Sequence, residues 1–351
     1  MKLTELSKQP SPWLRESGPL SEVVISSRIR LARNLADYEF KPCLTPERKK
    51  EILEIIKNAL LALPLEQPLF FIDVEEAAPL ERDLLAERYL ISLPHARSDG
   101  PRGVVVAQSE HFSAMINEED HLRMQVFAAA QQLEKCFEQI NRIDTLLESK
   151  VQYAFHPRYG YLTACPTNLG TGIRVSVMLH LPALKMTGQI EKFFNTARDC
   201  NLAVRGLFGE GSEAVGDFYQ LSNQVTLGVS EMEIVENFSA TIVPKIVDYE
   251  RVARRKLLEE TPEAIDDKIQ RSLAILRSAR LVSSQEALIL LSHVRLGIHT
   301  GRITDIPLSK INELFLYIQP AHLQMQAGRS LTPDQRDSLR AQIIRTALSV
   351  N

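Results

Sequence analysis

The chain has 351 residues, of which 44% are hydrophobic, enough for one large core and a second smaller one. Its formal net charge is only -3, which excludes the broad basic field that non-specific binding to nucleic acid or anionic membranes requires. There is no signal-like start and no run of 18 apolar residues. The four cysteines form no CxxC pair. We therefore expect a cytoplasmic protein with reduced thiols that binds neither nucleic acid nor membrane.

Residues 1–21 contain three prolines and a glycine and predict an irregular lead-in. Thr45 and Pro46 are a typical helix N-cap and first helical residue, and the apolar residues that follow recur at helical spacing. Short β-prone runs follow at 68–74, 89–93, 103–107 and 112–116. We expect a helix over 122–148 and further strands at 161–164, 174–181, 202–207 and 218–226.

Many short strands with few regular strand-helix-strand repeats favour an α+β fold with an antiparallel-rich sheet flanked by helices. From residue 233 onward the sequence predicts helices, with start signals at Thr261-Pro262, Ser283 and Thr332. We expect three regions: the lead-in at 1–21, a catalytic domain at 22–254 and a helical C-terminal domain at 255–351.

Four segments contain residue types suited to phosphate or to a cation, although the P-loop and the protein-kinase HRD and DFG motifs are absent. Arg28 and Arg30 in SSRIR would share one side of a strand and could clamp a polyphosphate. The other segments are NEEDHLR (117–123), CPTNLGTGIR (165–174) and RGLFGEGSEAVGD (205–217). Taken singly, the four segments are more typical of ordinary structure: in chain order, a solvated strand face, a helix start, a tight turn and a surface loop.

Together and in this order, the four segments resemble the ATP:guanido phosphotransferases, the phosphagen kinase family, over about residues 22–252. The resemblance implies a phosphagen-kinase catalytic domain, of the glutamine-synthetase-like fold, with ATP and Mg²⁺ as cofactors. It implies that Glu119 and Glu210 hold the acceptor guanidinium and that Cys165 lies beside the acceptor nitrogen. Five arginines would surround the ATP phosphates: Arg28, Arg30, Arg123, Arg174 and Arg205.

The whole nucleotide site that the resemblance implies includes neighbouring positions of the same segments. Its residues are Ser27, Arg28, Ile29, Arg30, Tyr89, Arg123, Arg174, Val175, Ser176, Val177, Met178, Arg205, Gly206, Leu207, Phe208 and Gly209. Tyr89 stands where the family commonly has a histidine near the adenine, and residues 95–102 look like a short insertion.

The residue types suit the chemistry of guanidinium phosphorylation. A guanidinium cannot attack phosphorus until one of its nitrogens loses a proton, because every lone pair is delocalised in the cation. Two carboxylates can orient the planar group and accept that proton. Arginines and Mg²⁺ neutralise the phosphate oxygens during transfer.

The C-terminal region contains Arg336, Asp337 and Arg340 in RDSLRA, which resembles the RDxxRA motif of the bacterial protein-arginine kinase branch. In that branch the motif binds phosphoarginine as an allosteric ligand. Two arginines four apart on a helix can face one phosphate, while Asp337 can pair with a guanidinium. The alternative is an ordinary charged helix face.

The branch resemblance implies that the substrates are proteins with exposed arginines. Only 25 residues precede Ser26, where small-molecule phosphagen kinases carry a helical domain, so we expect an open acceptor site. The branch also implies a stress-response role, an activator protein, a Clp-type protease partner and a homodimer. Two other functions remain open: a kinase of a free guanidino compound such as arginine, and a non-catalytic phosphoarginine-binding adaptor. The two glutamates and five arginines argue against the adaptor, which would need neither.

Overall fold

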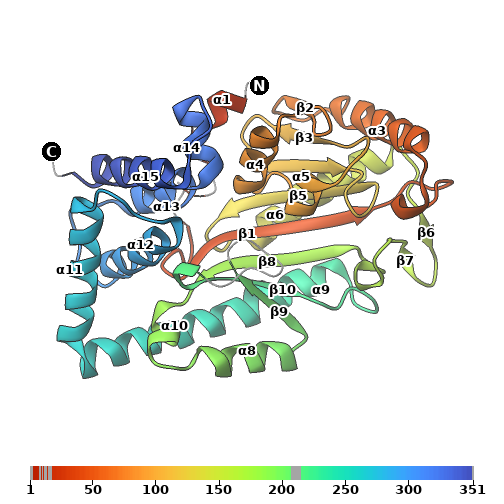
Figure 1. Cartoon of the computed structure of the whole chain (residues 1–351). Coiled ribbons are helices and arrows are strands. Elements are labelled where there is room, and N and C mark those ends of the chain that lie inside the picture. The colour runs from red at the N-terminus through yellow and green to blue at the C-terminus, as the bar shows by residue number, and fades with distance from the viewer. Residues whose placement is uncertain are drawn as a thin grey trace.

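The computed structural model describes residues 3–7, 9, 11, 14, 18–206 and 215–349. One antiparallel sheet of eight strands is flanked by helices, and a group of C-terminal helices packs beside one end of it (Figure 1). The strand order is β2-β3-β4-β5-β1-β8-β10-β9. This arrangement confirms the expected α+β class.

Strand β1 lies near the middle of the sheet, between β5 and β8. The strands are β1 (Val24–Arg33), β2 (Leu69–Asp73), β3 (Gly103–Ala107), β4 (Phe112–Ile116), β5 (Leu122–Ala129), β8 (Ile173–His180), β9 (Leu202–Gly206) and β10 (Phe218–Asn223). A separate hairpin pairs β6 (Phe155–His156) with β7 (Gly160–Tyr161). Because side chains alternate along a strand, each strand of the sheet contributes to two different faces.

The two faces of the sheet differ in chemistry. Ile29, Leu31, Val126 and Val175 are buried in the main hydrophobic core, together with apolar residues of the helices that cover this face. The residues between them, such as Arg28, point to the opposite face. One face is thus held by apolar burial, and the other is available for a polar site.

The helices before the C-terminal region are α1 (Leu3–Leu6), α3 (Pro46–Leu61), α4 (Pro79–Glu87), α5 (Leu93–Arg97), α6 (Leu133–Glu148), α7 (Pro182–Met186), α8 (Ile190–Asp199), α9 (Glu231–Glu236) and α10 (Val243–Glu260). Helix α3 begins as predicted: the Thr45 side chain accepts a hydrogen bond from the backbone N–H of Arg48, and Pro46 opens the helix. Its residues Ile52, Ile56 and Leu60 pack into the main core.

Three sequence predictions differ from the structure. Residues 122–129 form strand β5 and only 133–148 are helical, because Met124, Val126 and Ala128 alternate into the core between β4 and β1. Residues 89–92 connect the unpredicted helix α4 to α5, which begins at Leu93, and Tyr89 has a positive φ of 61°. The strand predicted at 161–164 ends at Tyr161.

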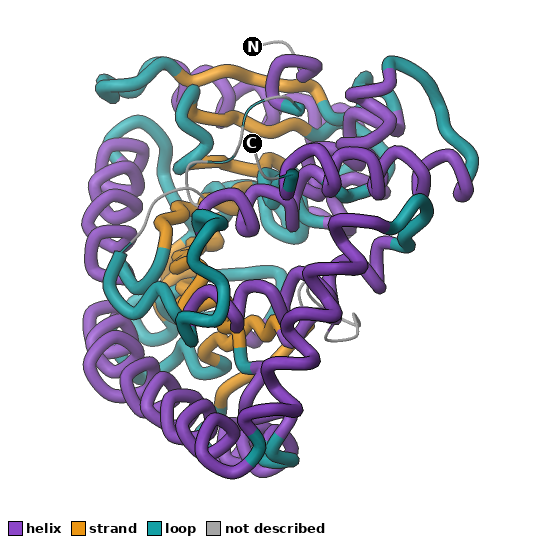
Figure 2. The backbone as a smooth tube through the Cα atoms, turned by 90° about the vertical axis from the view of Figure 1, so that its left-hand side faces the viewer, coloured by secondary structure: helices purple, strands orange, loops and turns teal. Residues whose placement is uncertain are grey.

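Five helices form the C-terminal region: α11 (Pro262–Ser278), α12 (Ser284–His299), α13 (Leu308–Tyr317), α14 (Pro320–Ala327) and α15 (Pro333–Leu348). Thr332 and Gln335 form the predicted capping box, whereas Ser283 makes only the first half of one, by accepting from the N–H of Glu286. Apolar residues of α11, α12, α13 and α15 share a second hydrophobic core. Figure 2 shows the C-terminal helices on the viewer's side of the sheet. In the described part of the chain, no helix combines the length and apolarity needed to cross a membrane.

The C-terminal region is joined to the sheet by buried polar contacts. Arg295 on α12 is fully buried and donates to the carbonyls of Ser21 and Glu22. Leu257 on α10 packs against both hydrophobic cores. We retain the division of the chain at residues 254 and 255 as a proposal.

Candidate active site

Four strands place arginines on the polar face of the sheet. Arg30 on β1 lies opposite Arg174 on β8, and Arg28 lies opposite Ser176. On β5, Gln125 pairs with Arg30, and Arg123 lies two residues before Gln125, so Arg123 is on the same face. Arg205 on β9 pairs with Gln220 of β10, and Gln220 pairs with Met178 of β8, which shares a face with Arg174. Arg205 therefore lies on this face as well. The structure therefore brings together all five arginines that the sequence predicted.

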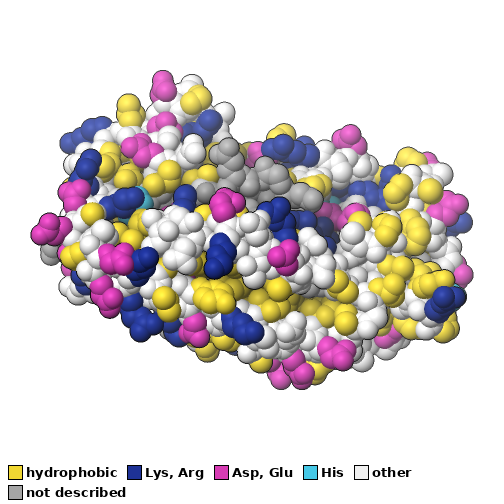
Figure 3. Space-filling model, turned by 90° about the horizontal axis from the view of Figure 1, so that it is seen from below, with side chains coloured by type: hydrophobic (Ala, Val, Ile, Leu, Met, Phe, Trp, Pro, Cys, Tyr) yellow, Lys and Arg dark blue, Asp and Glu magenta, His cyan; other side chains and the backbone are white. Residues whose placement is uncertain are grey.

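The arginines line a long cleft made of two adjoining hollows of about 810 and 940 Å³. Arg30, Arg123 and Arg205 belong to the walls of both hollows. Seen from below, several basic side chains lie together in a recessed area to the right of the centre (Figure 3). A cleft of this size, lined with arginines from distant segments, is suited to a polyphosphate ligand.

The positive charges of the five clustered arginines repel one another. Arg30 is 8% exposed, and its buried Nε and Nη2 have no hydrogen-bond partner among the described residues. Burial, and then the charges of the four neighbouring arginines, lower the pKa of Arg30 well below its ordinary value. Burial and Arg123 lower the pKa of Arg28 to about 9. An anion with several charges would relieve this repulsion.

Two of the three adjacent acids have structural partners. Glu118 accepts hydrogen bonds from Arg123 at 2.8 Å and from the hydroxyl of Ser92 at 2.5 Å. Burial would raise the pKa of Glu118, but the positive charge of Arg123, followed by these hydrogen bonds, lowers it to about 2. Asp120 accepts from the Asn34 amide and from the backbone N–H of Ala164, each at 2.7 Å. Both carboxylates thus hold the turn after β4 in place.

Glu119 is the exposed member of the three and lines the cleft together with Arg174 and Cys165. Partial burial, followed by the negative charges of Glu118 and Asp120, raises the pKa of Glu119. A hydrogen bond with the Cys165 side chain opposes this shift. The structure therefore provides a carboxylate with raised proton affinity beside the arginine cluster, as a general base requires.

Cys165 lies at the start of a short loop that the rest of the fold holds firmly. Its Sγ is 3.0 Å from the Thr167 hydroxyl. The Thr226 hydroxyl donates to the carbonyls of Thr167 and Leu169, at 3.1 and 2.7 Å. Gly170 has a φ of 106°, and an added Cβ would lie 2.5 Å from the carbonyl oxygen of Thr226, so glycine is needed there. The loop positions Cys165 and Glu119 in one wall.

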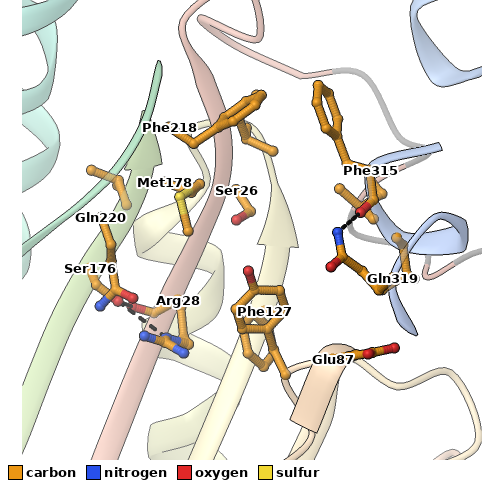
Figure 4. Close-up of a pocket in the computed structure, with 15 residues that line it drawn as sticks. Ser26, Arg28, Glu87, Phe127, Ser176, Met178, Phe218, Gln220, Phe315 and Gln319 are labelled. Carbon is orange, nitrogen blue, oxygen red and sulfur yellow. Dashed lines mark hydrogen bonds between the residues drawn. The ribbon is translucent and has the colours of Figure 1, made fainter. Parts of the chain in front are cut away.

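A mainly apolar pocket adjoins the other end of the cleft and shares Arg28 with it (Figure 4). Its walls include Met178, Phe127 and Phe218. Arg28 lies 5.5 Å from the centre of the Phe127 ring and donates from Nε to the Ser176 hydroxyl at 3.3 Å. An apolar pocket beside an arginine cluster is the arrangement that a nucleotide base and its phosphates need.

Several predicted nucleotide residues face away from the cleft. The side chains of Ile29, Val175 and Val177 lie in the main core, so only their backbone can border the site. Ser27 is also fully buried, and its hydroxyl donates to the carbonyl of Ala130 at 2.8 Å. This follows from strand alternation, which sends every second residue to the core. Gly206 ends β9.

The other predicted residues are distributed as follows. Ser176, Met178 and Tyr89 line the apolar pocket. Residues 207–210, which include the predicted Glu210, Leu207, Phe208 and Gly209, lie outside the described residues. The predictions missed several residues of the cleft and pocket walls: Glu87, Gln125, Phe127, Gln220, Phe315 and Gln319. A strand reading of 122–129 would have found two of them, since Gln125 and Phe127 alternate with Arg123.

The predicted phosphoarginine motif has a different geometry from the one expected. Arg340 is 1% exposed, and its guanidinium donates to the carbonyls of Ile318 and Val282 and to Asp337. It therefore does not share a surface with Arg336, because the helix turns its side chain into the C-terminal core. Arg336 and Asp337 are half-buried, and Arg336 donates to the carbonyl of Leu331 at 2.8 Å.

Similarities to known proteins show the family of the chain. Residues 51–253 match the profile of the ATP:guanido phosphotransferase C-terminal catalytic domain. The chain belongs to the ATP:guanido phosphotransferase family. Among solved structures, lombricine kinase is 26% identical with a TM-score of 0.59, and the match covers 71% of this chain and 75% of that one. The duplicated taurocyamine kinase from Schistosoma mansoni is 25% identical with a TM-score of 0.61, covering 71% of this chain and 36% of that longer chain.

The residues after the catalytic domain match a more specific group within this family. Residues 262–351 match the C-terminal domain of the protein-arginine kinase McsB. The chain is 44% identical to the protein-arginine kinase of Halothermothrix orenii over 351 residues, covering 100% of both chains. It is 45% identical to that of Brevibacillus brevis over 343 residues, covering 97% of this chain and 96% of that one.

Proposed function

We propose that this chain is an ATP-dependent protein-arginine kinase, which transfers the γ-phosphoryl group of ATP to the guanidinium of arginine side chains in proteins. The observation that carries the proposal is the single cleft that joins five arginines to Glu119 and Cys165. The full-length similarity to protein-arginine kinases supports a protein as the acceptor. The exposed position of Glu119 suits an arginine that enters from a polypeptide.

The cleft residues have separate roles in this reaction. The arginine cluster binds the phosphates and neutralises the charge that develops on the transferred group. Glu119 orients the acceptor guanidinium and accepts one proton from it. The freed nitrogen lone pair forms a bond to the γ-phosphorus, the bond from that phosphorus to the β,γ-bridging oxygen breaks, and ADP leaves. Cys165 donates a hydrogen bond to Glu119 or lies against the acceptor nitrogen.

Glu210 remains the proposed second carboxylate on the strength of the family resemblance. Mg²⁺ is proposed to arrive with ATP and to supply charge neutralisation at the phosphates. In the described residues, no group of three or more His, Cys, Asp or Glu side chains is arranged to hold a metal ion. Phosphate oxygens and water are accordingly the ligands proposed for it.

The family branch motivates several further proposals. Phosphoarginine would bind at Arg336 and Asp337 as a regulator, with Arg340 supporting the site from within the core. We also propose that the chain forms a homodimer and that its partners include an activator protein and a Clp-type protease. The proposed setting is the stress response in the cytoplasm.

The proposal is tested by incubating the purified chain with MgATP and either an unfolded protein or free arginine. Acid-labile phosphoarginine, measured by ³¹P NMR and by mass spectrometry at neutral pH, is expected on the protein. Phosphorylation of free arginine alone would replace the proposal with a small-molecule guanidino kinase. Phosphoarginine binding without phosphoryl transfer would support the adaptor instead.

A further inference from the structure

The apolar pocket has one wall from the sheet and another from the C-terminal helices. Figure 4 shows Phe315 and Gln319 on one side of the pocket and Met178, Gln220 and Arg28 on the other. Phe315 lies on α13, and Gln319 lies between α13 and α14. The C-terminal region therefore completes the pocket that, under the proposed function, receives the nucleotide base.

The orientation of the Gln319 amide is determined by its neighbour. The side chain is 4% exposed, and its Nε2 donates to the carbonyl of Phe315 at 2.7 Å. A carbonyl accepts but cannot donate, so the amide nitrogen must face Phe315 and the amide oxygen must face the other way. Figure 4 shows this oxygen pointing into the pocket. The pocket wall thus presents one oriented hydrogen-bond acceptor.

A buried network holds this wall against the sheet domain. The Glu87 carboxylate accepts from the N–H groups of Ala321 and His322, at 2.7 and 3.0 Å, and so caps the N-terminus of α14. It also lies 2.8 Å from Nδ1 of His322. Arg88 pairs bidentately with Glu110 and lies 3.3 Å from Nε2 of the same histidine. Gln319 is therefore held by a rigid support immediately before α14.

We infer that Gln319 selects adenine over guanine in the nucleotide pocket. The 6-amino group of adenine is a donor that can meet the Oε1 of Gln319. Guanine carries an oxygen at the same position, which would place two acceptors face to face. A buried acceptor left without a partner disfavours the wrong base, and the amide cannot flip without breaking its bond to Phe315.

The inference rests on the proposed function for the identity of the ligand, and modified nucleotides test it separately. ATP, GTP and purine riboside triphosphate, which lacks the 6-amino group, would be compared as phosphoryl donors and as competitors in equilibrium binding. In the wild type, ATP should be preferred to both by about tenfold or more, the value expected for one buried hydrogen bond. Equal binding of ATP and purine riboside triphosphate would overturn the inference without any mutation.

Gln319→Leu completes the test, with Gln326→Leu, at an exposed position on α14, as the matched control. The preference for ATP over purine riboside triphosphate should disappear in Gln319→Leu and persist in Gln326→Leu. An undiminished preference in folded Gln319→Leu would show that another group reads the base. If the wild type binds nucleotides with this preference but phosphorylates no arginine, the proposed function fails while the assignment of Gln319 stands.

Discussion

Arg340 on α15 donates a hydrogen bond of 2.9 Å from Nε to the carbonyl of Ile318, the residue that precedes Gln319. Its Nη1 donates to the carbonyl of Val282 at 2.8 Å, and the side chain is almost fully buried. The proposed phosphoarginine motif is thus connected, through one arginine, to the wall of the proposed base pocket. This contact makes Arg340 a structural support whose removal affects both regions.

Arg340→Ala should lower the free energy of unfolding by about 2–4 kcal/mol, because two buried backbone carbonyls lose a charged donor. Arg336→Ala is the matched control: it loses one hydrogen bond at a half-buried site and should cost less than about 1 kcal/mol. Urea unfolding at neutral pH measures both. Similar values for the two variants would contradict the support role of Arg340.

Phosphoarginine should stimulate the wild type at low concentration if Arg336 and Asp337 bind it. A regulator must bind the active and less active states with different affinity to change turnover. Arg336→Ala with Asp337→Asn should abolish the response and retain basal activity, since asparagine still offers an oxygen to Arg340. The measurement is the initial rate across a phosphoarginine titration, with phosphoarginine binding followed calorimetrically. Unaltered binding in the double variant would remove these residues from the site.

Glu119→Gln should reduce kcat by about 10²- to 10⁴-fold, because the amide cannot accept the guanidinium proton. ATP binding should stay within about threefold of the wild type, since the arginine cluster is intact. Glu138→Gln, on the exposed surface of α6, is the control for loss of one negative charge. The rate of phosphoarginine formation and the affinity for ATP are measured for the wild type and both variants. Near-normal turnover in Glu119→Gln would show that another group is the general base.

Arg30→Met should stabilise the ligand-free protein by about 1–3 kcal/mol, because it removes a buried charge that four other arginines repel. The same change should abolish most of the stabilisation by ATP, which depends on phosphate contacts. Thermal unfolding with and without MgATP measures both effects. Arg142→Met, at an exposed site on α6, should change neither. A less stable ligand-free Arg30→Met protein would show that Arg30 has a favourable partner without ATP.

Stability should fall as pH decreases from about 7.5 to 5.5. Burial lowers the pKa of several histidines in the folded state, so below their ordinary pKa of 6.5 the unfolded chain binds more protons than the folded one. These histidines are His95, His121, His180, His293, His299 and His322. His293→Gln should reduce the pH slope, because the pKa of His293 is lowered to about 4. Urea unfolding at three pH values measures the slope; a stability that rises on acidification would contradict the prediction.

Local sequence signals were enough for the fold class, for helix α3 and for the family to which the chain belongs. The Thr45-Pro46 start acts within a few residues, and the alternation of Arg28 and Arg30 is a property of the strand itself. The chemistry of the segments also predicted the residue types of the cleft. These features depend on nearest neighbours, which is why they can be inferred without a structure.

The tertiary structure decided which of these residues face the cleft. Glu119 is exposed in the cleft, whereas Glu118 and Asp120 are buried and accept hydrogen bonds from Ser92, Arg123 and Asn34. Ser92 and Asn34 lie far from these acids in the sequence. Residues 122–129 became a strand because β1 and β4 flank them. The burial of Arg340 and the approach of Gln319 to the sheet depend on how the C-terminal helices pack. Contacts between distant segments carry no local signal, so one sequence alone does not reveal them.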